Sequence, residues 1–292
     1  MLKTGVVLEN RYRVLRQIGK GGMSKVFLVE DIYTGVRKAV KESKIGKGES
    51  GNYHAQSIRH PGLLEVESIK ICGDSGLILM EYVDGQSLQE ILIKRGAQPY
   101  SILLDWMLQL CDILTYLHTR TPPIIYRDIK PSNIILQQDG RLKLIDFGAA
   151  REYRAGNSED TVLLGTKGYA APEQYGGCGQ TDARTDIYGL GATIYHLATN
   201  RDPLKPSFMN HPIIHFVPDI PKIFSNIVQK CTHFEPQKRY ESCSEIKSDL
   251  LCLKGRALLP KKRTESKFNS QAIYGNYNIE TDITVVFTST VF

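Results

Sequence analysis

Residues 124–148 read IIYRDIKPSNIILQQDGRLKLIDFG, and this stretch decides the fold. Asp139 and Gly140 stand between two apolar runs, IIL and LKLI. An Asp-Gly pair in that place predicts a tight β-hairpin, because the turn requires positive φ angles that glycine adopts without steric cost. The polar segment YRDIKPSN precedes the first strand of this hairpin, and DFG follows the second. The fold should therefore bring these two polar segments to the same end of one hairpin.

Three side chains in those two segments could share a metal ion. Asp128 and Asn133 precede the hairpin, and Asp146 follows it. Carboxylates and amide oxygens are hard ligands, suited to Mg²⁺ that is bound jointly with phosphate oxygens. The sequence therefore predicts a site for magnesium and phosphate at this end of the hairpin.

The spacing of these residues resembles that of a known family. Asp128, Lys130 and Asn133 fit D-x-K-x-x-N, and Asp146 begins D-F-G, which is similar to the catalytic and metal-binding loops of protein kinases. The alternative is an ordinary hairpin whose loops carry solvated charges. The resemblance, closest to the bacterial Hanks-type serine/threonine kinases, implies a bilobal α+β fold. We expect a small β-rich N-lobe with a shortened C-helix region, and a larger helical C-lobe.

A glycine-rich segment, IGKGGMSKV, begins at Ile18 between predicted strands at 11–18 and 27–30. Glycine lets backbone N–H groups approach phosphates closely. In the family pattern G-x-G-x-x-G-x-V, Ser24 stands where the third glycine would be. A plain β-turn explains the segment about as well. The resemblance assigns nucleotide contacts here to Ile18, Gly19, Lys20, Gly21, Gly22 and Val26.

The strand predicted at 36–41 ends in Ala-Val-Lys, which resembles the V-A-I-K strand of the family. The resemblance implies that Ala39 lines the nucleotide site and that Lys41 holds the α- and β-phosphates, whereas a lone lysine at a strand end is often only a solvated charge. Strands are also predicted at 63–71 and 77–83. The second ends in a stretch similar to the kinase hinge, although an edge strand running into a loop is the alternative. The adenine would contact Met80, Glu81 and Val83.

The stretch 42–59 departs from the family pattern. A helix that carries a glutamate to pair with the β-strand lysine should follow. The expected position falls on Gly51, with Glu42 and Glu49 as the nearest candidates. Glycines cost about 1 kcal/mol per helical position, so only 53–59 is predicted to be helical. Either Glu49 substitutes for the missing glutamate or the ion pair is missing.

The rest of the chain to residue 253 is predicted to be largely helical. Helices are expected at 101–120, 182–197, 223–231 and 244–253, the last capped by Ser244. The residues 150–164 resemble an activation loop, with Ser158 and Thr161 as sites whose phosphate Arg127 could grip. The resemblance also implies three further roles. Thr166 would lie beside the catalytic residues, Asp186 would cap the catalytic loop, and Arg239 would pair with Glu173, while Tyr126 is a packing residue.

Composition limits the classes of protein. The chain has 292 residues, 41% of them hydrophobic, and a net charge of +6. This mildly basic balance does not by itself indicate nucleic-acid binding. No stretch has the roughly 20 apolar residues of a membrane span, and the N-terminus lacks the apolar core of a secretory signal. The six cysteines form no C-x-x-C pair. We therefore expect a soluble, cytoplasmic protein without a membrane span.

The predicted boundaries are 10–83 for the N-lobe, 84–253 for the C-lobe and 254–292 for a tail that is basic and then polar. The tail is expected to be mostly disordered, although ITVVF is a β-prone window that could act as an edge strand or aggregate. Its threonines 281, 284 and 288 could be phosphorylated and recognised by a phosphothreonine-binding domain. A dimer is also kept as an option.

The resemblance implies ATP-dependent phosphorylation of Ser and Thr hydroxyls on proteins, including autophosphorylation. Asp128 would accept the hydroxyl proton and Lys130 would stabilise the transferring phosphate, while Asn133 and Asp146 would hold Mg²⁺. A pseudokinase that acts as a nucleotide-dependent binding module is the alternative, motivated by the stretch 42–59. A kinase of small molecules is a third reading. It is disfavoured by the activation-loop pattern at 150–164 and by Ala171-Pro172-Glu173, which resembles the A-P-E motif that closes this loop in the family.

Overall fold

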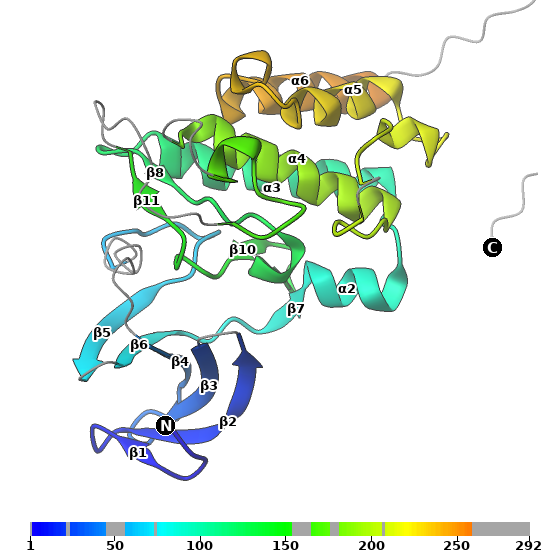
Figure 1. Ribbon diagram of the computed structural model, residues 1–292. Coiled ribbons are helices and arrows are strands. Elements are labelled where there is room, and N and C mark those ends of the chain that lie inside the picture. The colour runs from blue at the N-terminus through cyan, green and yellow to red at the C-terminus, as the bar shows by residue number, and fades with distance from the viewer. Residues whose placement is uncertain are drawn as a thin grey trace, which may run out of the picture. The chain divides into compact units, whose positions relative to one another are not determined.

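The computed structural model describes residues 2–21, 24–44, 56–72, 75–153, 165–175, 181–205 and 208–258. Residues 1–257 form one compact unit. Figure 1 shows a strongly twisted sheet at one end of this unit and a stack of helices at the other. The predicted bilobal α+β architecture is therefore confirmed. None of the helices in the described ranges is long and apolar enough to cross a bilayer.

The N-lobe is built on an antiparallel sheet whose strand order is β1-β2-β3-β4-β6-β5. Its strands are β1 (Val7–Leu8), β2 (Tyr12–Lys20), β3 (Ser24–Asp31), β4 (Arg37–Lys44), β5 (Val66–Cys72) and β6 (Ser75–Glu81). Side chains alternate between the two faces of a strand. Accordingly, Val40 packs in an apolar cluster with Val14 and Phe27, whereas Ala39 belongs to the main core. Alternation thus places Ala39 and Lys41 on the same face of β4.

Two predictions in the N-lobe need correction. The strand predicted to begin at residue 63 begins at Val66, because the preceding residues pair with the hairpin instead. Leu64 N–H donates to the carbonyl of Leu144 (2.9 Å), and Leu144 N–H donates to the carbonyl of Gly62 (2.9 Å). The helix predicted at 53–59 is wrong for residues 56–59, which form a turn and irregular structure. Residues 53–55 lie outside the described part.

The C-lobe contains α2 (Leu88–Arg95), α3 (Tyr100–His118), α4 (Ala183–Thr199), α5 (Lys222–Cys231) and α6 (Cys243–Leu258). Helix α4 packs against both α3 and α5, and its side chains are buried on nearly every side, as expected of a central helix. Helix α6 continues beyond residue 253, so the first residues of the predicted tail are helical. At its start, Glu245 N–H donates to the hydroxyl of Ser242 (3.3 Å), which corrects the predicted cap at Ser244.

The hairpin predicted from Asp139 and Gly140 is present. Strands β9 (Ile134–Gln137) and β10 (Leu142–Leu144) pair antiparallel, and Gly140 has φ +83°. Strand β7 (Gly85–Ser87), which follows the hinge in the chain, pairs with β9, so the hairpin lies beside the end of the hinge. A second small sheet pairs β8 (Ile124–Ile125) with β11 (Arg151–Glu152) on either side of the polar segments. These pairings hold residues 126–133 and 145–150 next to each other.

Candidate active site

A buried carboxylate on α4 binds the backbone of the loop before the hairpin. Asp186 accepts hydrogen bonds from the backbone N–H of Tyr126 (2.8 Å) and of Arg127 (2.6 Å). It also lies 2.8 Å from Nε2 of His118, the last residue of α3. Asp186 is 1% exposed, so this charge is compensated entirely by donors in the protein. The contact to the loop was predicted, whereas the contribution of His118 was not.

Arg127 adopts a backbone conformation that non-glycine residues seldom occupy, with φ +66°. Besides the bond to Asp186, its Nε–H donates to the carbonyl of Ala149 (2.6 Å), and Gln174 Nε2 donates to the carbonyl of Arg127 (2.9 Å). Such strain persists where several contacts determine the geometry. The predicted phosphate sites, Ser158 and Thr161, lie outside the described residues.

Asp128 is the centre of a polar network. Its Oδ1 accepts a hydrogen bond from the hydroxyl of Thr166 (2.7 Å), and its Oδ2 accepts one from Nζ of Lys130 (2.7 Å). Lys130 Nζ also donates to the hydroxyl oxygen of Thr166 (2.6 Å). Asn133 Nδ2 donates to Oδ2 of Asp128 (2.9 Å). The network fixes the orientation of the carboxylate and puts a lysine beside it.

Asp146, which follows the second strand of the hairpin, forms a second polar cluster. Its Oδ1 accepts from Nζ of Lys41 (2.8 Å) and from the N–H of Gly148 (2.9 Å). Burial raises the pKa of this carboxyl, but the charge of Lys41 and these hydrogen bonds outweigh burial, so the pKa lies below its ordinary value. Asp146 is therefore ionised at neutral pH.

Tyr126 does more than the packing predicted for it. The side chain is fully buried and meets the ring of Phe147 edge to face, with 5.6 Å between the ring centroids. Its hydroxyl oxygen also accepts a hydrogen bond from the N–H of Asp146 (3.2 Å). Burial raises the pKa of Tyr126 well above its ordinary value, so the hydroxyl remains neutral. This tyrosine thus links the two polar segments.

A cavity of about 300 Å³ lies between the sheet and the hairpin, and it has an apolar wall with polar groups at one end. Of the predicted nucleotide-site residues, those that line it are Ile18, Gly19, Gly21, Val26, Ala39, Lys41, Met80, Glu81, Val83, Asn133 and Asp146. Lys20 does not line it, and Gly22 lies outside the described residues. Sequence reasoning missed Ser24, Leu64, Tyr82, Ile135 and Ile145. An apolar slot that ends in a lysine and two oxygen ligands fits a nucleotide base with its phosphates at the polar end.

The hinge carries an ion pair that the sequence did not indicate. Lys143 on β10 donates from Nζ to both carboxylate oxygens of Glu81, at 2.6 and 2.8 Å. Glu81 Oε1 also accepts from the N–H of Glu65 (2.7 Å), and the N–H of Glu81 donates to the carbonyl of Glu65 (3.0 Å). Because the backbone N–H of Glu81 is already bonded to Glu65, the backbone group that Glu81 can offer to a ligand is its carbonyl.

The missing helix glutamate has two candidates in the sequence, and the structure bears on one of them. Glu42 follows Lys41 on β4, so its side chain projects from the opposite face of the strand. Its carboxylate accepts a hydrogen bond from the N–H of Leu2 (3.2 Å). Glu42 therefore does not pair with Lys41. Glu49 and Gly51 lie outside the described residues.

The donor set fits magnesium. Asn133 directs its amide nitrogen to Asp128, which leaves its amide oxygen without a hydrogen bond from any residue that the structure describes. Asp146 keeps Oδ2 while Oδ1 is engaged by Lys41. Both residues line the polar end of the cavity. An amide oxygen and a carboxylate oxygen are ligands that Mg²⁺ takes when phosphate oxygens complete its coordination shell.

A buried ion pair supports the site from the C-lobe. Arg239 donates from Nη1 and Nη2 to the two oxygens of Glu173, at 2.7 and 2.9 Å, which is the pairing that the sequence predicted. The hydroxyl of Thr185 on α4 also donates to Glu173 (2.9 Å). These bonds anchor Glu173 to α4 through Thr185, at the end of the segment that contains Thr166.

Comparison with known proteins agrees with this geometry. Residues 12–257 match the model of the family described as protein kinase domain. Serine/threonine-protein kinase PrkC of Bacillus subtilis is 30% identical to the chain, over 84% of the chain and 41% of that protein. Serine/threonine-protein kinase PknB of Mycobacterium tuberculosis is 29% identical, over 84% of the chain and 43% of that protein.

A solved structure gives the same result. The crystal structure of the Mycobacterium tuberculosis PknI kinase domain superposes with a TM-score of 0.67 at 25% identity, covering 86% of this chain and 99% of that chain. The chain spans about two fifths of the length of the curated relatives it matches. The family match nevertheless covers most of the chain, from β2 into α6. The chain therefore belongs to the protein kinase family.

Proposed function

We propose that this protein transfers the γ-phosphate of ATP to serine and threonine hydroxyls of proteins, itself included. One observation supports this most: the network of Asp128, Lys130 and Thr166 lies next to a nucleotide-sized cavity that ends at Lys41 and Asp146. A phosphate acceptor and a phosphate donor could therefore meet at Asn133, which contacts Asp128 and lines the cavity. The printed names of the relatives, serine/threonine-protein kinases, agree with this proposal.

In the proposed reaction the oxygen of the acceptor hydroxyl bonds to the γ-phosphorus, and the bond from that phosphorus to the β–γ bridging oxygen breaks. Asp128 takes the hydroxyl proton, and ADP is the leaving group. Lys130 stabilises the negative charge on the transferring phosphoryl group, and Lys41 holds the α- and β-phosphates. Asn133 and Asp146 would hold Mg²⁺, which supplies charge neutralisation to the phosphate oxygens. The chain contributes mainly positioning and electrostatic stabilisation.

The test is the mass of the intact, dephosphorylated protein after incubation with ATP and Mg²⁺. The wild type should gain phosphate groups, and Asp128→Asn should gain none while still binding ATP. Asp139→Asn is the matched control, because Asp139 lies in the exposed hairpin turn of the same stretch, with a side chain that is 53% exposed. It should gain phosphate like the wild type.

Failure of the wild type to gain phosphate or to phosphorylate any added protein, with ATP binding retained, would contradict the proposal and favour the pseudokinase alternative. Equal phosphate gain by Asp128→Asn would contradict the assignment of Asp128 as the base.

Three finer proposals rest on the sequence. The tail threonines, once phosphorylated, would be bound by a phosphothreonine-binding domain, the protein would act in the cytoplasm, and two copies of it could form a dimer. Affinity measurement with a tail peptide phosphorylated at Thr281, Thr284 or Thr288 tests the first. Cell fractionation and sedimentation test the other two.

A further inference from the structure

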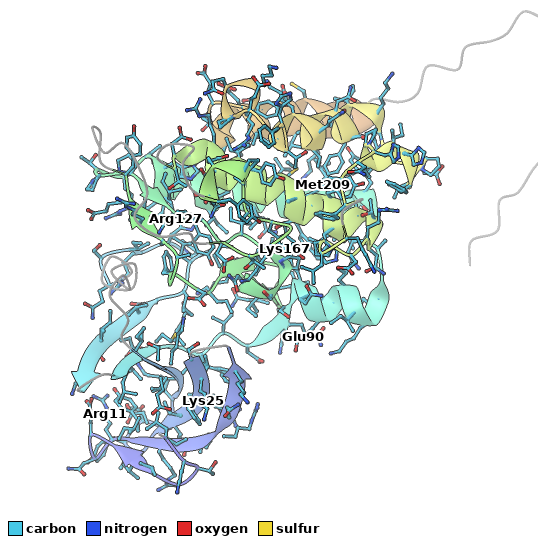
Figure 2. All side chains as sticks on the ribbon, viewed as in Figure 1. Arg11, Lys25, Glu90, Arg127, Lys167 and Met209 are labelled. Atoms are coloured by element: carbon cyan, nitrogen blue, oxygen red, sulfur yellow. The ribbon has the colours of Figure 1, made fainter. Side chains whose placement is uncertain are left out.

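Lys167 is an exposed cation next to the place where an acceptor hydroxyl must lie. A general base must be within hydrogen-bonding distance of the proton that it takes, so the acceptor must reach Asp128. Thr166 already contacts Asp128 through its hydroxyl at 2.7 Å. Lys167 is the next residue, and consecutive Cα atoms are only about 3.8 Å apart. In the view of Figure 2, Lys167 lies between α4 and α2.

The backbone around Lys167 is rigidly held. The N–H groups of Tyr169 and Ala170 both donate to the carbonyl of Thr166, each at 3.0 Å. Tyr169 is buried, and its hydroxyl lies 2.6 Å from Nδ1 of His196 on α4. Gly168 has φ +91°, and a Cβ on it would meet the carbonyl oxygen of Pro203 at 2.5 Å. The turn therefore buries the residues that follow Lys167 and leaves Lys167 itself in solvent.

The charge of Lys167 is not compensated by a direct contact. Among the residues that the structure describes, none forms an ion pair or a hydrogen bond with its ammonium group. The segment that meets the turn at Pro203 also carries Asp202, whose carboxylate accepts the N–H of Leu204 at 2.9 Å and forms no ion pair with Lys167. Lys205, on the same segment, is also exposed, but it is not adjacent in the chain to Thr166. A peptide whose acceptor reaches Asp128 would therefore pass the ammonium group of Lys167, which no described carboxylate contacts.

We infer that Lys167 makes the enzyme prefer serine or threonine acceptors with an acidic side chain directly beside them, an inference that rests on the proposed function. The lysine stem is flexible and carries a point charge, so it can follow a carboxylate on a neighbouring residue of the bound peptide. The interaction is near the surface and is screened by salt.

The chain itself contains a matched pair of acceptors. Thr281 stands between Glu280 and Asp282, whereas Thr284 stands between Ile283 and Val285. The inference selects Thr281 over Thr284 as the substrate of the two. The sequence 274–283, YGNYNIETDI, therefore serves as a peptide probe with a single threonine.

The experiment compares kcat/KM for phosphorylation of Thr281 in this peptide and in its Glu280→Gln/Asp282→Asn form, using the full-length enzyme. We expect the acidic peptide to be preferred by about two- to fivefold, the range of exposed ion pairs. The preference should shrink in about 0.5 M NaCl, where the Debye length is only a few ångströms. The single substitutions Glu280→Gln and Asp282→Asn show which neighbour of the acceptor faces the lysine.

Variants of the enzyme test whether Lys167 causes the preference for the acidic peptide. Lys167→Met should remove the preference, Lys167→Arg should keep it, and Lys167→Glu should favour the neutral peptide. Lys205→Met is the matched control and should keep the preference. The fluorescence of Trp106, the single tryptophan, checks that each variant is folded.

The outcomes separate the inference from the function that it rests on. Equal kcat/KM for the two peptides, or a preference that survives in Lys167→Met, would overturn the inference alone. A preference lost in Lys205→Met instead would also overturn it. Absence of phosphorylation of either peptide and of any other protein would overturn the proposed function and the inference with it.

Discussion

Replacement of Asp186 by asparagine should loosen the catalytic loop from α4. The carboxylate accepts the N–H groups of Tyr126 and Arg127, at 2.8 and 2.6 Å, and contacts His118. Asparagine keeps one oxygen and puts an NH₂ donor in place of the other. One backbone N–H of the loop then faces a donor and is left buried without an acceptor.

The magnitude follows from two contributions. Stranding one buried donor costs about 1–3 kcal/mol. Replacing the carboxylate by a neutral acceptor weakens the remaining hydrogen bond by roughly half, which adds about 1 kcal/mol. Asp186→Asn should therefore lower the free energy of unfolding of the C-lobe by about 2–4 kcal/mol. Because the left-handed φ of Arg127 is held partly by this contact, kcat should fall as well.

The assay is urea unfolding followed by the fluorescence of Trp106, which is buried on α3 at 4% exposure and so reports on the C-lobe. The control is Asp182→Asn, which changes the N-cap of the same helix. Asparagine is also a good N-cap, so this variant should lose well under about 1 kcal/mol. If Asp186→Asn were no less stable than Asp182→Asn and kept full kcat, the proposed anchoring would be refuted.

Three further predictions follow from other contacts. Arg239→Met leaves Glu173, which is 6% exposed, as an uncompensated buried charge, so urea unfolding should show a loss of about 3–5 kcal/mol; the double variant Arg239→Met/Glu173→Gln should be more stable than Arg239→Met, and the opposite order would contradict the reasoning. Lys143→Met frees the hinge carboxylate of Glu81, so KM for ATP should rise about two- to fivefold with little change in kcat. As a control, Lys70→Met removes an exposed pair with Glu9 and should leave KM unchanged. Equal KM values for the wild type, Lys143→Met and Lys70→Met would exclude a role for the hinge pair. Burial lowers the pKa of His196 from 6.5 to about 4, so the unfolded chain binds a proton before the folded one as the pH falls; stability should therefore decrease between pH 6.5 and 4, by up to about 3 kcal/mol, and a His196→Gln variant with the same pH dependence would show that another group is responsible.

The sequence by itself determined the elements whose signals are local. The hairpin after the catalytic loop follows from Asp139 and Gly140. Its loop has three residues, 138–140, because Gln137 N–H pairs with the carbonyl of Arg141, and the one positive φ of this loop falls on Gly140. The long helix α3 follows from apolar residues at helical spacing, since one face of that period must be buried. The convergence of Asp128, Asn133 and Asp146 follows from the hairpin, because a hairpin returns the chain to where it began.

Boundaries were less predictable for a physical reason. The strand was predicted to begin with Leu63 and Leu64, yet the backbone of 62–64 pairs with Leu144 of the hairpin, so β5 begins only at Val66. Pairing partners are chosen by the whole fold and not by the residues themselves. Residues 56–59 contain no glycine, yet they form a turn and irregular structure, so the absence of a helix breaker did not make them helical.

Only the tertiary structure decided which polar groups meet across the fold. Lys143 looks like a solvated charge on a strand, and its pairing with Glu81 depends on the hinge crossing β10. His118 and Tyr126 look like core residues, and their contacts with Asp186 and with the N–H of Asp146 depend on segments 68 and 20 residues away. A buried polar group must find a partner, but the sequence does not say which one lies within hydrogen-bonding distance. That choice depends on packing to within an ångström, which no local pattern encodes.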